Sequence, residues 1–192
     1  ADEVLKFLEI PEMPKLTALV PYVLGWMVSM GSTTASSISM EGKSLWIIKS
    51  LPVSARDWLA AKLKVTLMLS IPSILITSTL VVIGLKPTFY DAVWMYVLPL
   101  AYTLAFSVFG LWLNIRMPRL DWQSEAEAIK QGGAIMVSVF AGMAAGFAPA
   151  VAVAITGSAI IAPIVAALLF AMALLMWASL VRSGEKRMLM LH

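Results

Sequence analysis

The sequence predicts an all-α protein, a polytopic bundle of about five transmembrane helices with a short cytoplasmic helix–break–helix after the first span. Hydrophobic residues make up 60% of the 192 residues and charged residues only 13%, about half the charge of an average soluble chain. The mean hydropathy is +0.89. Five apolar stretches are each long enough, at about 20 residues, to cross the hydrocarbon of a bilayer. We therefore expect a single membrane domain, residues 1–192, with no soluble domain beside it.

The composition of each stretch predicts where it lies relative to the membrane. Residues 1–15 are mildly amphipathic and predict an outer surface segment, and residues 182–192 form a basic cytoplasmic tail. Gly142 and Gly146 form a GxxxG pattern, which lets helix backbones approach closely and predicts helix packing. The spans are expected at 16–40, 65–85, 92–115, 132–155 and 157–181.

Hydroxyl side chains are concentrated in the second half of the first span, at helical spacings of i, i+4 and i+7. Small and hydroxyl side chains serve as helix–helix contacts in lipid, which favours a packing role. A polar wall on a substrate path is the alternative, and the pattern leaves both open. The residues concerned are Ser29, Ser32, Thr33, Ser36 and Ser39.

Residues 41–64 form the longest stretch in which charged and apolar residues alternate, with five Lys or Arg against two acids. Residues 44–51 predict a short helix that ends before Pro52, because proline lacks an N–H and disfavours helical geometry at the preceding residue. Ser54, with Asp57 three residues later, predicts the capped start of a second helix. An ordinary interfacial loop with tryptophans among lipid headgroups is an equal alternative.

The distribution of basic residues predicts the orientation. With residues 41–64 inside the cell, the inner segments hold eleven of the fourteen Lys and Arg, and the outer segments hold only Lys6, Lys15 and Lys86. The positive-inside rule then predicts a plasma-membrane protein with its N-terminus outside and its C-terminus in the cytoplasm. An outside N-terminus without a signal peptide is unusual, so we expect a C-terminal fragment that lacks at least one earlier span.

Two stretches carry a recognisable pattern. In one, Glu41 and Gly42 follow the first span, Leu51-Pro52-Val53-Ser54 comes next, and Lys62 lies ten residues after Pro52. The other is residues 113–122, followed by Lys130-Gln131. The first resembles the signature of ABC-2-type exporter permeases, the transmembrane subunits of bacterial ABC exporters. The second is similar to a cytoplasmic loop of one bacterial subgroup of that family.

The resemblance implies a permease that forms part of a translocation path and docks a separate ABC ATPase subunit, which would bind ATP–Mg. This chain itself would bind no cofactor. A second permease half or a homodimer would complete the path. Leu45 and Ile48 share a helical face and Leu51 extends it, so we expect an apolar row that enters the ATPase. The expected coupling residues are Glu41, Gly42, Leu45, Ile48, Leu51, Pro52 and Lys62.

Other functional classes fit the residues less well. The chain has no cysteine and a single histidine, His192, so we expect no catalytic and no metal-binding residues. Gly42-Lys43-Ser44 resembles the end of a Walker A loop, but Ser37 stands where that motif needs glycine. The predicted spans contain no Asp, Glu, Lys, Arg or His, which disfavours an ion-coupled secondary transporter and an intramembrane protease.

We therefore expect a transport component rather than an enzyme. Membrane lipid is an expected partner. Nucleic acid is not, because the basic residues are spread over several loops instead of one folded face. The alternative from another class is a structural or regulatory membrane protein, such as an assembly or immunity factor, without transport activity.

Overall fold

The computed structural model describes residues 16–30, 33–120, 122 and 132–190. This part of the chain is all-α and contains no strand, which confirms the predicted fold class. Five helical segments are long and apolar enough to cross a membrane, so the chain is a polytopic membrane protein. They are α2 (Leu16–Met30) with the short helices after it, α5 (Ala55–Leu85), α6 (Phe89–Asn114), α8 (Gly133–Thr156) and α9 (Ile161–Met190).

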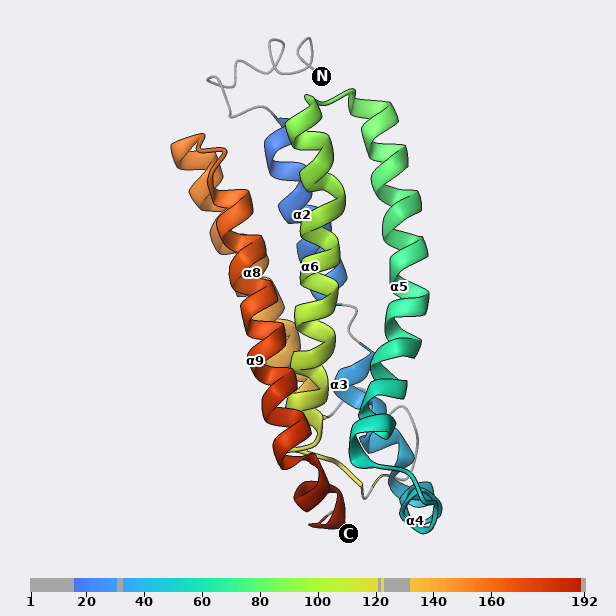
Figure 1. Ribbon diagram of the computed structural model, residues 1–192. Coiled ribbons are helices and arrows are strands. Elements are labelled where there is room, and N and C mark those ends of the chain that lie inside the picture. The colour runs from blue at the N-terminus through green and yellow to red at the C-terminus, as the bar shows by residue number, and fades with distance from the viewer. Residues whose placement is uncertain (1–15, 31–32, 121, 123–131, 191–192) are drawn as a thin grey trace.

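Helix α6 lies at the centre of the bundle and contacts α2, α5, α8 and α9 (Figure 1). The packing of α6 against α2 is close. Tyr102 is fully buried, and its ring lies so near α2 that a Cβ on Gly25 would overlap with it. The Tyr102 hydroxyl donates to Ala145 O of α8 at 2.6 Å. One tyrosine of α6 therefore joins α2 and α8.

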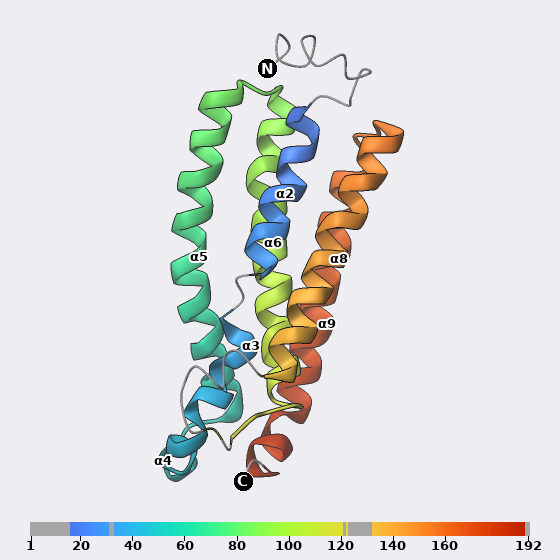
Figure 2. The ribbon, with the colours of Figure 1, turned by 180° about the vertical axis from the view of Figure 1, so that it is seen from behind.

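Helices α2 and α8 pack beside each other on one side of α6 (Figure 2). Gly142 and Gly146 lie where α8 approaches α2. A Cβ on Gly142 would come within 2.8 Å of Ser29 Oγ, and one on Gly146 within 2.5 Å of Trp26 Cβ. Glycine at both positions allows this separation of the two backbones.

The segment predicted as one span over 16–40 is built from several pieces. Helix α2 ends at Met30, and α3 (Thr34–Ser37) and the 3-10 helix η1 (Ser39–Ser44) follow. Between them, the N–H groups of Ile38 and Ser39 donate to Asn114 Oδ1 of α6, at 2.7 and 3.0 Å. These long-range bonds hold the junction of α3 and η1 against the end of α6.

The helix break in the middle of residues 41–64 is formed as the local rules predict. Helix α4 (Leu45–Ser50) ends before Leu51, which is extended at φ −83° and ψ 145°, the geometry that proline imposes on the residue before it. Ser54 caps α5, and its Oγ accepts from Asp57 N at 3.1 Å. Helix α5 then runs without interruption from Ala55 into the apolar stretch.

Candidate functional site

The first stretch singled out in the sequence meets the described part of the second, residues 113–120 and 122, at one end of the bundle, which we call the α4 end; Lys130 and Gln131 lie outside the described residues. The α4 end contains α3, η1, α4, the first turns of α5 and the segment that follows α6, and the C-terminal part of α9 lies nearby (Figure 1). Helix α4 projects from this end. The turns between α5 and α6 and between α8 and α9 lie at the opposite end.

An ion pair joins the two halves of the first stretch. Lys62 Nζ of α5 lies 2.7 Å from Glu41 Oε1 of η1, and it also donates to Ser37 O at 2.8 Å. Trp58 Nε1 donates to the other carboxylate oxygen of Glu41 at 3.1 Å, and the ammonium lies 5.2 Å from the centre of the Trp58 ring. Lys62 is 10% exposed and Glu41 31%, so water screens the pair only in part.

A second polar cluster joins the first stretch to the segment after α6. Asn114 is 1% exposed, accepts from two backbone N–H groups and donates to Ser39 Oγ at 2.8 Å. Ser39 Oγ also accepts from Arg119 N at 3.0 Å, and Ser39 O accepts from Trp122 Nε1 at 2.8 Å. Gly42 packs against this segment, because a Cβ there would lie 2.9 Å from Leu120 O.

Asn114 was not among the residues predicted for the site. Its signal in the sequence is a lone amide near the end of an apolar span, where a buried polar group has to find hydrogen-bond partners. The partners, Ile38 and Ser39, lie 76 and 75 residues earlier in the chain, so no rule about neighbouring residues could identify them.

The apolar side chains of α4 divide between two faces. Leu45 is 5% exposed and belongs to a buried cluster with Trp58, Leu59 and Leu180, against which Ile48 packs. This corrects the prediction of Leu45 and Ile48 as an exposed row, because both face the chain's own core. Pro52, another of the expected coupling residues, is exposed. Trp46 and Ile47 of α4 are exposed, at 69% and 45%, and so are Leu51 and Val53 in the segment that joins α4 to α5, at 51% and 43%. We call these four residues the α4 face.

The hydroxyl residues predicted for a pathway or for packing are placed as follows. Ser29, Ser36 and Ser39 are buried, and the first two donate to the backbone carbonyls of Trp26 and Thr33. Thr33 Oγ1 lies 3.0 Å from Thr66 Oγ1 of α5. Ser32 lies outside the described residues. The bonds of Ser29 and Ser36 stay within one turn, whereas Thr33 contacts α5 and Ser39 contacts Asn114 of α6, which favours the packing interpretation for these two residues.

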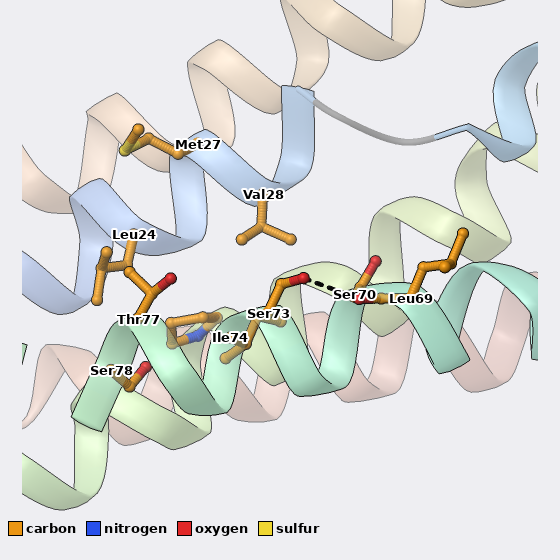
Figure 3. Close-up of a pocket in the computed structure, with 10 residues that line it drawn as sticks. Leu24, Met27, Val28, Leu69, Ser70, Ser73, Ile74, Thr77 and Ser78 are labelled. Carbon is orange, nitrogen blue, oxygen red and sulfur yellow. Dashed lines mark hydrogen bonds between the residues drawn. The ribbon is translucent and has the colours of Figure 1, made fainter. Parts of the chain in front are cut away.

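A groove runs between α2 and α5, over α6, with a volume of about 380 Å³ (Figure 3). Apolar side chains of α2 form one wall, and α5 contributes hydroxyls and apolar groups to the other. Sequence reasoning missed it, although Ser70, Ser73 and Thr77 show the spacing of one helical face. The labelled lining residues are Leu24, Met27, Val28, Leu69, Ser70, Ser73, Ile74, Thr77 and Ser78.

The arrangement at the α4 end suits binding and mechanical connection. Among the described residues, no three His, Cys, Asp or Glu side chains gather in a group that could hold a metal ion. Comparison of the chain with family models, curated proteins and solved structures found no match.

Proposed function

We propose that this chain is the membrane-spanning permease subunit of an ABC-2-type exporter, and that the α4 face docks a separate ATPase subunit. The observation that carries the proposal is the apolar exposure of α4 and of the segment after it. Leu45 and Ile48 pack on the bundle, while the α4 face (Trp46, Ile47, Leu51 and Val53) is exposed beyond the apolar part of the spans. An exposed apolar patch at the end of a bundle is typical of a surface that another molecule covers.

The chemistry of the α4 face favours a protein partner. Tryptophan is enriched among the residues that dominate binding energy at interfaces, and Trp46 is the most exposed member of this patch. Basic residues surround the patch in sequence, which fits a partner with an acidic rim. The same basic residues support a cytoplasmic location for the α4 end through the positive-inside rule.

The contacts of α4 offer a path from the ATPase to the membrane. A push on α4 would reach α5 through the ion pair between Glu41 and Lys62, and it would reach α6 through Ser39 and Asn114. In the chain, α2 precedes and α5 follows the segment that contains α4, and these two helices also form the two walls of the groove. A change in their separation would therefore change the width of the groove.

The groove suits an amphiphilic substrate, because it combines apolar side chains with hydroxyls. Within the apolar window of α5 only 11% of the residues are buried. That leaves most of this helix for lipid or for a second permease half, which would complete the path. ATP hydrolysis would belong to the partner subunit, and no step of it would use a residue of this chain.

The experiment that tests the proposal is capture of the partner at the α4 face. A photo-reactive amino acid at position 46 should crosslink, in native membranes, to a soluble protein with a Walker A motif, identified by mass spectrometry. The same probe at Phe89, which is 86% exposed at the opposite end, is the matched control. If position 46 captures only lipid or proteins without a nucleotide-binding site, the chain is the structural or regulatory alternative.

A further inference from the structure

A second pocket lies at the end of the bundle opposite α4, with a volume of about 390 Å³. It is lined by α2, by the first turns of α6, by the facing ends of α8 and α9 and by the turn between them. We call it the aromatic pocket, because Tyr22, Tyr90 and Trp94 line it together with the carboxylate of Asp91. Among the described residues that line it, none is a Lys or an Arg.

Hydrogen bonds from three elements hold these groups in place. Tyr90 OH donates to Ala159 O in the turn between α8 and α9 at 2.6 Å, which fixes its ring across the pocket. The rings of Tyr90 and Trp94 lie 6.0 Å apart at 60°. Asp91 N donates to Thr88 Oγ1 at 3.3 Å, and Asp91 Oδ2 accepts from Thr17 Oγ1 of α2 at 3.2 Å.

We propose that the aromatic pocket binds an organic cation, an alkylated ammonium group, beside Asp91 and against the rings of Trp94 and Tyr90. The faces of aromatic rings attract cations, and quaternary ammonium groups are recognised by such rings in many proteins. A carboxylate next to the rings adds direct charge attraction. This inference concerns the end of the bundle away from α4, and it does not depend on an ATPase partner.

Other ligands suit the pocket less well. A calcium ion takes six to eight oxygen ligands, often from several carboxylates, whereas this pocket offers one carboxylate. An anion would be repelled by Asp91. A purely apolar ligand would leave the charge of Asp91 balanced only by the hydrogen bond from Thr17, with no opposite charge in a partly enclosed site. The ammonium could come from the choline headgroup of a phospholipid or from a free small cation.

Binding of choline to the purified full chain in phosphatidylglycerol nanodiscs tests the proposal, with isothermal titration calorimetry as the readout. Wild-type protein should bind choline, and 3,3-dimethyl-1-butanol, its neutral isostere, should not compete. Asp91→Asn keeps an acceptor for Thr17 but removes the charge, and Trp94→Leu removes a ring, so each should weaken binding by about tenfold or more. Asp57→Asn, at the α4 end, is the control and should bind as wild type does.

A second measurement separates the two sources of the cation. Protein purified from mixed membranes of phosphatidylcholine and phosphatidylglycerol should retain phosphatidylcholine, detected by lipid mass spectrometry, if the ligand is a headgroup. Binding of choline without such retention identifies a free cation. The proposal is overturned if Asp91→Asn, with unchanged helicity and elution volume, binds choline as tightly as wild type. Equal binding of the neutral isostere, or no binding of choline and no retained phosphatidylcholine, would overturn it as well.

Discussion

Lys62 of α5 reaches back to Glu41 of η1 with 2.7 Å between Nζ and Oε1, and the same ammonium donates to Ser37 O at 2.8 Å. The two charges are 21 residues apart in sequence and lie on either side of α4. Their pairing therefore fixes where α4 sits relative to the first turns of α5. A force on α4 would therefore act on both η1 and α5, the two elements that this ion pair joins.

Replacement of Lys62 by Met should destabilise the chain by about 1–3 kcal/mol, because it leaves Glu41 and Ser37 O without their partner in a partly buried place. The expected loss is below that for a fully buried pair, since Glu41 is 31% exposed. Unfolding in mixed micelles with increasing SDS, followed by circular dichroism, measures it. Lys64→Met, at an exposed position of the same helix, is the control. Equal losses in the two variants would show that the pair contributes nothing specific.

Replacement of Asn114 by Leu should cost about 2–4 kcal/mol, because two backbone N–H groups that it satisfies would become buried donors without an acceptor. The matched control is Ser107→Ala. Ser107 is also buried on α6, but it accepts from Thr34 Oγ1 through its backbone carbonyl, so the bond of 2.7 Å survives the change. The same SDS titration compares the two. If Ser107→Ala unfolds at as low an SDS fraction as Asn114→Leu, the Asn114 amide has no special role in stability.

Two glycines should respond in opposite directions to alanine. At Gly42 a Cβ would lie 2.9 Å from Leu120 O, a backbone atom that cannot turn away, so overpacking should cost about 1–3 kcal/mol. At Gly84, inside α5, nothing lies within 4 Å, and alanine should stabilise the helix by about 0.5–1 kcal/mol. Thermal melting of both variants in one detergent measures the difference. A neutral Gly42→Ala would show that the segment after α6 is not held against η1.

These residues also show how far the sequence alone could lead. Pro52 acts on its neighbour Leu51, and Ser54 acts on Asp57 three residues later, so both features follow from rules that span one turn. The spans follow from composition, because a bilayer requires a certain length of apolar helix. The fold class and the helix break were therefore predictable.

The rest of the site depends on contacts between distant segments. Leu45 and Trp46 are adjacent in sequence, yet one is 5% exposed and the other 69%. Leu45 shares its buried cluster with Leu59 of α5 and Leu180 of α9, so residues of other helices decide which face of this six-residue helix turns inward. Likewise, the bonds that hold Ile38 and Ser39 against the end of α6 come from Asn114, which belongs to another span.

The orientation can be tested with single cysteines, since the chain contains none of its own. Ser50 at the α4 end and Thr88 at the opposite end are both exposed. In intact cells an impermeant thiol reagent should label Thr88→Cys and leave Ser50→Cys unlabelled until the membrane is permeabilised. Labelling of Ser50→Cys from outside would reverse the orientation, and the proposed docking of an ATPase would fail with it.

The most direct measurement is the affinity of the ATPase captured at position 46 for the chain carrying Ile47→Asp. Ile47 is 45% exposed on the α4 face, so the change should leave the SDS unfolding curve as it is. Burial of an isoleucine in a partner is worth about 1.5–3 kcal/mol, so binding should weaken by about tenfold or more. The conservative control Ile47→Val should bind nearly as wild type does. Unchanged ATPase affinity in a stable Ile47→Asp chain would contradict the account, because the α4 face would then be an anchor among lipid headgroups.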